Sequence, residues 1–252
     1  MFLVRLIFSA YYWVYFTVTS VFLITLTVVT WALSAWWDPS RLWLHGVNWI
    51  WARTYLLGNP FWRLTIRGKE RLDWSRPTLY VANHLSTFDI FVLFCLNSRF
   101  HWISKRSNTR IPALGLNMIL CRTIFLDRES PKDILAMVKQ SVKRLEEGIS
   151  LLIFPEGERS LTGHLNPFLG GAFSIAKRAR VPIQPIVITG TYQILQRHSA
   201  LLNPVGRMSV TVLDPIPAEQ VDALSTEELS KLVHNRMAEA LPPEHKPLPE
   251  GE

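Results

Sequence analysis

The segment TLYVANHLSTFD, residues 78–89, joins two apolar runs through a short polar turn. Its first part, Thr78–Ala82, is short, apolar and partly β-branched, as in a buried strand, and the run from Thr87 to Leu96 has the length of a helix. The same alternation of short strands and longer amphipathic stretches continues through the chain after Phe61. Strands and helices in alternation predict an α/β fold, a mostly parallel sheet flanked by helices.

This alternation locates the predicted elements. Strands are expected at Arg63–Arg67, Thr78–Ala82, His101–Ser104, Thr123–Leu126, Ser150–Phe154, Ile183–Thr189 and Met208–Leu213. Helices are expected at Thr87–Leu96, Leu114–Leu120, Lys132–Glu147, Ala172–Arg180 and Glu227–Ala240. We expect residues 61–241 to form one domain, and the proline-rich residues 242–252 to form a disordered tail.

An apolar run without charge, glycine or proline separates Arg5 from Asp38. Its roughly 32 residues would form a helix about 48 Å long, whereas the hydrocarbon core of a bilayer is about 30 Å thick. Aromatic residues gather at both ends, in 11–15 and 31–37, as they do at membrane interfaces. The sequence therefore predicts that residues 1–60 anchor the protein to a membrane, as a transmembrane helix followed by an interfacial helix.

Two alternatives to the anchor stay open at this stage. A cleaved signal peptide fits Arg5 and the small residues around Ala35, although the apolar core of such a peptide is usually about 7 to 15 residues. The β-branched run Thr17–Thr30 could also be a strand, although strands rarely exceed about ten residues. More basic residues follow the run than precede it, which predicts a body on the cytoplasmic face of the inner cell membrane.

The charge of the chain is concentrated in one stretch. The net charge is +7 in 252 residues, and it accompanies a positive mean hydropathy of +0.15 and ten Trp. Between Arg99 and Arg144 ten Lys or Arg face three acids, an excess equal to the whole net charge. Such an excess favours anionic partners, but these charges lack the interleaved stacking aromatics and the recognisable module of nucleic-acid binders. We expect the basic face of the helix at Lys132–Glu147 to meet anionic headgroups or an acidic acyl carrier.

His84 and Asp89 lie on either side of the turn that follows the strand Thr78–Ala82. Ligands of open α/β sheets bind at the carboxyl ends of the strands, so this turn is a candidate site. If His84 precedes the helix and Asp89 lies in its first turn, the carboxylate can orient the imidazole and leave one ring nitrogen free as a general base. Alternatively, Ser86 and Asp89 form a capping box with no catalytic role.

A second polar turn, PEGERS at residues 155–160, follows the predicted strand Ser150–Phe154. Its loop can face the same crevice, where Arg159 could bind a phosphate and Glu156 could accept hydrogen bonds from substrate hydroxyls. Alternatively, Glu156 and Arg159 form an ordinary surface ion pair. Lys105 follows the strand His101–Ser104 and by itself would be a solvated lysine.

Four sequence blocks, in order, resemble those of the glycerolipid acyltransferases, specifically 1-acyl-sn-glycerol-3-phosphate acyltransferases of the PlsC type. The blocks are Asn-His-x-x-x-x-Asp at 83–89, the segment 105–128 with its Ile-Phe-Leu-Asp-Arg ending, Phe-Pro-Glu-Gly-x-Arg-Ser at 154–160, and Val-Pro-Ile-x-Pro-Ile at 181–186. They cover about residues 78–189, and the apolar N-terminal anchor matches as well.

The resemblance implies transfer of a fatty acyl group from a thioester, acyl-CoA or acyl-ACP, to the sn-2 hydroxyl of lysophosphatidic acid. It implies no metal and no cofactor beyond the donor substrate. His84 would be the general base and Asp89 would orient it. The phosphate would be held by Lys105, Arg159 and Arg128, and Glu156 and Gly157 would line the glycerol end.

Several positions depart from the family pattern. Glu158 replaces the usual Thr, Leu169 and Gly170 stand where basic residues are common, and Arg106 and Ser107 replace part of a common Lys-x-Glu-Leu pattern. These departures leave the His84–Asp89 pair intact but leave the acceptor open. The alternatives are another lysophospholipid, glycerol 3-phosphate, or a non-catalytic protein that only binds anionic lipid.

Overall fold

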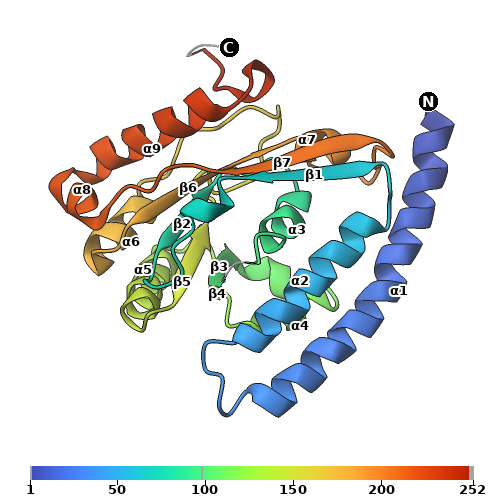
Figure 1. Ribbon diagram of the computed structural model, residues 1–252, viewed down its shortest axis with the longest axis horizontal. Helices are drawn as coiled ribbons and strands as arrows, with labels where there is room; N and C mark the ends of the chain where they lie inside the picture. Colours follow the sequence, from blue (N-terminus) through green and yellow to red (C-terminus); the bar gives the residue numbers. More distant parts are fainter. Residues whose placement is uncertain (1, 98, 250–252) are drawn as a thin grey trace.

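The computed structural model describes residues 2–97 and 99–249, which form one seven-stranded sheet with helices on both faces (Figure 1). The strands are β1 Trp62–Arg67, β2 Leu79–Ala82, β3 Phe100–Lys105, β4 Ile124–Leu126, β5 Ser150–Ile153, β6 Ile183–Thr189 and β7 Gly206–Val212. Their order across the sheet is β1-β7-β6-β2-β5-β3-β4. All strands expected from the sequence are present, with ends shifted by at most two residues.

The sheet is mostly parallel, as predicted. β2 pairs in parallel with both β5 and β6, so it lies in the middle, and β3 links β5 to β4. β7 is the exception, because it runs antiparallel to β6 and carries β1 alongside in parallel. The α/β class is confirmed, with the loops after β2, β3, β4 and β5 gathered at one edge of the sheet.

The helices of the body are α3 Phe88–Phe94, α4 Leu114–Leu120, α5 Pro131–Glu146, α6 Gly171–Ala179, α7 Thr191–Ile194, α8 Ala218–Ala223 and α9 Thr226–Ala240. Five of them match predicted helices. The short α7 and α8 were not predicted, because helices of four and six residues have too few turns to show a hydrophobic period.

Alternating side chains of the strands divide the core into two layers. In β2, Tyr80 and Ala82 pack with α1, α2 and α3, whereas Leu79 and Val81 pack with α5, α6 and α9. All four are at most 1% exposed. Burying a large apolar side chain contributes about 1.5 to 3 kcal/mol, so a central strand of this composition fixes both layers to the sheet.

The N-terminal segment forms an antiparallel pair of helices, α1 Phe2–Ser34 and α2 Leu42–Leu57 (Figure 1). A strand at Thr17–Thr30 is therefore wrong. α1 is long and apolar enough to cross a membrane. It also contacts the body along its length, from a hydrogen bond between Trp13 Nε1 and the Ala200 carbonyl (2.8 Å) to one between Asn117 Nδ2 and Thr27 Oγ1 (3.4 Å).

The expected disorder of the tail is wrong for residues 242–249. A short 3₁₀ helix forms at Pro243–His245, and the His245 side chain is 2% exposed. Its Nδ1 lies 2.7 Å from the Gly163 carbonyl, and its own carbonyl accepts from the Leu165 amide at 3.0 Å. These contacts tie the tail to the loop that follows the PEGERS turn, and they order a segment whose composition alone would not hold it.

Candidate active site

Asn83 fixes the point at which the chain leaves the sheet after β2. Its side-chain oxygen accepts from the Ile188 amide (2.7 Å), and its side-chain nitrogen donates to the Ile188 carbonyl (2.9 Å). The amide group thus takes the place of the next backbone partner in the pairing of β2 with β6. The chain can turn toward α3 while the buried polar groups of Ile188 stay satisfied.

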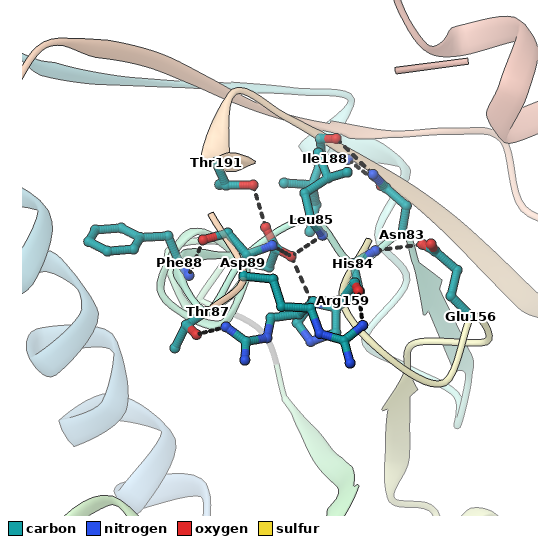
Figure 2. A network of polar contacts seen from close by, with 12 residues as sticks. Asn83, His84, Leu85, Thr87, Phe88, Asp89, Glu156, Arg159, Ile188 and Thr191 are labelled. Atoms are coloured by element: carbon teal, nitrogen blue, oxygen red, sulfur yellow. Dashed lines mark hydrogen bonds and ion pairs between the residues drawn. The ribbon is translucent and has the colours of Figure 1, made fainter. Parts of the chain in front are cut away.

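His84 and Asp89 form a hydrogen-bonded pair across this turn (Figure 2). His84 Nδ1 lies 2.7 Å from Asp89 Oδ2, and the side chains are 15% and 0% exposed. Asp89 also accepts from the Leu85 amide (2.6 Å), the Ser86 amide (2.8 Å) and the Thr191 hydroxyl (2.5 Å). Because a carboxylate only accepts, Nδ1 carries the proton and Nε2 is left as the acceptor.

The alternative of a capping box formed by Ser86 and Asp89 is met in part. The Asp89 carboxylate does accept from the Ser86 amide, as a capping box requires. The Ser86 hydroxyl, however, donates to the Leu195 carbonyl at 2.6 Å and so ties the turn to the end of α7. Asp89 therefore fixes the start of α3 and the imidazole of His84 at the same time.

Phe154, at the end of β5, fixes the plane of the His84 ring. The two rings are stacked with centroids 3.9 Å apart and planes 8° from parallel. The backbone of the same turn is bound as well, because the Ser160 amide donates to the His84 carbonyl at 2.8 Å. With Asp89 on one ring nitrogen and Phe154 on one face, the free nitrogen has a fixed direction.

Glu156 lies beside His84, as expected, and both of its oxygens accept from backbone amides. Its Oε1 accepts from the His84 amide (2.7 Å) and its Oε2 from the Asn166 amide (3.0 Å), and the residue is 6% exposed. Burial raises the pKa of this carboxyl to about 8, against the lowering effect of the two amides. Glu156 holds the His84 loop to the PEGERS turn. The surface ion pair with Arg159 does not occur among the described residues.

Two arginine side chains lie close to the His84–Asp89 pair. Arg159 Nη1 donates to the Thr87 hydroxyl at 2.9 Å, so its guanidinium lies over the start of α3. Burial and the nearby charge of Arg197 lower the pKa of Arg159. Arg197 donates to the Arg159 carbonyl (2.9 Å) and pairs with Glu158 (2.7 Å). The positive charges are closely spaced, and an anion would stabilise them.

Glu158 lies among these basic side chains. The Arg197 hydrogen bond lowers the pKa of Glu158 most, followed by the charges of Arg197, Arg128 and Lys105. Gly157 has a φ of +82°, and a Cβ there would lie 2.8 Å from Leu169 Cδ1 and 3.6 Å from Arg128 Nη1. The loops after β3, β4 and β5 thus bring Lys105, Arg128 and Arg159 to one region, as strand-end placement predicts.

Two residues of the site were missed from the sequence. Thr191 follows β6, and the strand-end rule that selected His84 would have selected it too. Arg197 lies in the loop after α7 and had no periodic or motif signal. Its contacts with residues 158 and 159 are about 40 positions away in sequence and could not be anticipated.

Comparison with known proteins agrees with this geometry. A family model described as "Acyltransferase" matches residues 63–189, which contain both polar turns and six of the seven described strands at least in part. The chain belongs to this acyltransferase family.

Relatives in the acyltransferase family include 1-acyl-sn-glycerol-3-phosphate acyltransferases of several eukaryotes. The protein of Chlamydomonas reinhardtii is 35% identical over 81% of this chain and 60% of its own length. A chloroplastic one of Arabidopsis thaliana is 32% identical over 86% of this chain and 61% of its own length. The chain thus spans about 60% of the length of these curated relatives.

A solved structure shows the same fold over nearly the whole chain. The 1-acyl-sn-glycerophosphate acyltransferase PlsC of Thermotoga maritima superposes with a TM-score of 0.80 at 21% identity, covering 94% of this chain and 95% of that one. The coverage includes the N-terminal helices as well as the sheet, so the helical pair and the α/β body belong to one architecture.

Proposed function

We propose that this protein transfers a fatty acyl group from an acyl thioester to the sn-2 hydroxyl of lysophosphatidic acid, giving phosphatidic acid. The observation that carries the proposal is the orientation of His84, whose Nδ1 is held by Asp89 so that Nε2 is left as the acceptor, on a turn whose Thr87 hydroxyl binds Arg159. A hydroxyl nucleophile needs a base, and a phosphorylated acceptor needs cations. This site places both together.

The reaction follows from the tautomer of His84. Nε2 accepts the proton of the acceptor hydroxyl while that oxygen attacks the thioester carbonyl. The C–O bond forms, the C–S bond breaks, and the sulfur leaves with the proton returned from the imidazolium. Buried Asp89 stabilises the transient positive charge on the ring. General-base catalysis of this kind contributes a factor of about 10² to 10⁴, and positioning supplies much of the rest.

In this proposal the basic residues hold the phosphate of the acceptor. Arg159 binds the Thr87 hydroxyl at the start of α3, Arg197 pairs with Glu158, and the charges of Lys105 and Arg128 also act on Glu158. The phosphate would displace the Glu158 carboxylate from Arg197, because two anions cannot share the same guanidinium at low cost. Glu156 and Gly157 then support the loop that carries Arg159, and their contacts are with the protein itself.

A small apolar pocket of about 30 Å³ lies between α1, α2, α3 and α4, and in this proposal one end of the acyl chain enters it. Its walls include Phe16 on α1, Trp51 and Tyr55 on α2, and Phe91 and Phe94 on α3. Asp89 lies on the same short helix as Phe91 and Phe94, so the pocket and the His84–Asp89 pair share a structural element. Apolar walls lower the free energy of a fatty acyl group relative to water.

The helical pair favours attachment at a membrane surface. The outer side of α1 is exposed and apolar, with Phe2, Ile7, Val14 and Phe22 among its exposed residues. Because the body contacts α1 from Trp13 to Thr27, a helix crossing the bilayer would draw part of the body into the hydrocarbon core. We therefore favour an interfacial position for α1 over the spanning helix expected from length, with the body on the cytoplasmic side.

The names of the relatives support the acceptor assignment, since the proteins of Chlamydomonas reinhardtii and Arabidopsis thaliana are both 1-acyl-sn-glycerol-3-phosphate acyltransferases. Glu158 favours a second candidate, an acceptor whose phosphate carries less charge, such as another lysophospholipid with a phosphodiester. One negative charge fewer on the acceptor reduces its repulsion by the Glu158 carboxylate.

Purified protein incubated with radiolabelled acyl-CoA or acyl-ACP tests both candidates. The panel of acceptors is lysophosphatidic acid, lysophosphatidylglycerol and glycerol 3-phosphate. We expect phosphatidic acid to be the main product and His84→Ala to abolish it. Preference for the phosphodiester acceptor would replace the first candidate by the second. Lipid binding without product for any pair of substrates would contradict an acyltransferase and favour a lipid-binding protein.

A further inference from the structure

A second basic pocket lies at the opposite edge of the sheet from His84. It has a volume of about 630 Å³, and its lining includes Pro39 and Ser40 of the α1–α2 turn, Arg122, and Lys143, Arg144 and Glu147 at the end of α5. The Ser40 carbonyl is 3.0 Å from Nε2 of His101, near the start of β3, and Ile149 of the lining directly precedes β5. The pocket therefore faces the amino ends of the strands, and the α1–α2 turn that lines it lies far from α7 (Figure 1).

Positive charge dominates this pocket. Arg122 donates to the Pro39 carbonyl at 2.9 Å and so bridges the turn and the body. Arg144 pairs with Glu147 at 3.3 Å, and Lys143 is 3.9 Å from the same carboxylate. One carboxylate is thus shared by two cations, while Arg122 has a carbonyl partner and no carboxylate within ion-pair distance among the described residues.

Arg41 adds a buried positive charge behind the pocket. It is 8% exposed, and its Nη1 donates to the carbonyls of Ala35 and Asp38 at 2.8 and 3.0 Å. Its Nε is buried with no partner. Burial lowers the pKa of Arg41, and the charge of Arg122 lowers it further. The Asp38 carboxylate accepts from Ser40 and from the Trp43 amide, so it neutralises this group only in part.

Exposed apolar side chains lie three positions in the sequence from residues that line the pocket. Trp36 in the α1–α2 turn is 82% exposed, Trp43 at the start of α2 is 59% exposed, and Ile119 on α4 is 52% exposed. Tryptophan next to Lys or Arg is typical of protein surfaces at the level of lipid headgroups. A concave basic pocket with exposed Trp residues close by in the chain fits a single phosphate group that is attached to acyl chains, whereas an acidic carrier protein would need a broad exposed surface.

We propose that this pocket binds the headgroup phosphate of an anionic phospholipid of the surrounding bilayer, and that it is separate from the substrate site. Arg122, Lys143 and Arg144 would contact the phosphate, and the acyl chains would lie along Trp36 and Trp43. The inference rests on the interfacial placement of α1 proposed above. Its function would be to hold the α1–α2 turn at headgroup depth while the His84 edge stays open to substrates.

The test compares binding to vesicles of phosphatidylcholine alone with binding to vesicles that contain about a third phosphatidylglycerol. We expect the K143Q/R144Q variant to bind the anionic vesicles roughly 30-fold more weakly, because each basic group near an anionic surface contributes about fivefold. Binding to neutral vesicles should not change. The matched control, K132Q/K139Q, removes two exposed cations from the same helix outside the pocket and should change binding less than about threefold.

Equal losses of binding to anionic vesicles in the two double variants would contradict a specific site in the pocket and indicate diffuse electrostatic attraction. If millimolar inorganic phosphate displaces the wild-type protein from anionic vesicles, the ligand of the pocket is free phosphate and the assignment to a lipid headgroup is wrong. Unchanged vesicle binding with selective loss of acyl-ACP use would indicate a carrier protein instead. Turnover of K143Q/R144Q in detergent micelles should equal that of wild type, which separates failure of this site from failure of the proposed reaction.

Discussion

The carboxyl and amino ends of the strands form two edges of the sheet. Both edges carry clustered basic side chains, but they differ in the other polar groups present. At the carboxyl edge Lys105, Arg128 and Arg197 surround Glu158, and at the amino edge Arg144 and its neighbours surround Glu147. Only the carboxyl edge among the described residues adds a histidine oriented by a buried carboxylate. The charges at both edges suit an anion, and in the proposed reaction the turns that leave the carboxyl ends of the parallel strands add the base that acts on it.

Histidine variants at the two edges should give the largest contrast. His84→Ala removes the base, and we expect turnover to fall by about 10² to 10⁴ with a nearly unchanged melting temperature. His101→Ala removes a buried ring bonded to the Ser40 carbonyl, so it should lower the melting temperature and leave the turnover of folded protein near wild type. Measurements of turnover and of thermal unfolding in the His84→Ala and His101→Ala variants test both expectations. Equal turnover in the two variants would contradict the assignment of the base.

Arginine variants at the two edges should differ in their KM for the acceptor. Arg159→Gln should raise the KM for lysophosphatidic acid by about tenfold or more, because a charge-assisted contact to a phosphate contributes about 1.5 to 3 kcal/mol. Arg144→Gln, at the amino edge, should leave this KM unchanged in detergent micelles. Initial rates over a range of acceptor concentrations measure both. A loss in kcat with constant KM in Arg159→Gln would assign that residue to the transition state alone.

Replacing the two carboxylates should have a smaller effect. Glu158→Thr releases Arg197 and removes a negative charge that is 58% exposed. We expect the KM for lysophosphatidic acid to fall a few-fold, and the preference over a phosphodiester acceptor to increase. Glu147→Thr is the matched control at the amino edge and should not alter either quantity. A higher KM in Glu158→Thr would show that Glu158 positions Arg197 and does not compete with the phosphate.

The pH dependence of stability should have opposite signs at the two edges. Burial raises the pKa of Glu156 to about 8, so its contribution is complete below pH 4.5 and is lost as the pH rises toward 8. Burial lowers the pKa of His101 to about 4, so its contribution is complete above pH 6.5 and is lost as the pH falls toward 4. Above pH 6.5 only the first effect remains.

We expect the melting temperature of the wild-type protein to fall by about 2 to 4 °C between pH 6.5 and 8. Glu156→Gln should remove most of this slope, although it lowers the melting temperature at pH 6.5 by losing one acceptor for a backbone amide. Thermal unfolding across this range checks the effect. An identical slope in Glu156→Gln would show that this carboxyl is not the group that titrates.

Much of the carboxyl edge could be predicted because it depends on local pattern. The β2 turn and the β5 turn each follow an apolar strand, so topology alone brings His84 and Arg159 to one crevice. Arg197 and the tail were not predictable in this way. Arg197 acts through a loop without periodicity, and His245 is held by the Gly163 carbonyl, 82 positions away in the sequence. Amino-acid composition does not predict a contact between residues that only folding brings together.

Glu156 shows a different kind of limit. The sequence correctly placed it at the end of β5 near His84, but its expected contact with the substrate assumed that a polar side chain at a strand end points into the crevice. Both of its oxygens instead bind backbone amides that would otherwise be buried without partners. Residue type and position alone do not show which backbone amides will be buried and need an acceptor.

The contacts between α1 and the loop at residues 200–202 also set an order for biosynthesis. Trp13 leaves the ribosome 187 residues before its hydrogen-bond partner Ala200. At roughly 5 to 20 residues per second, this gap lasts about 10 to 40 s. During that time the exposed aromatic helix has no body to pack against, and a nearby lipid surface is the apolar environment that can receive it. The membrane would then host the first helix of this protein before the enzyme around it exists.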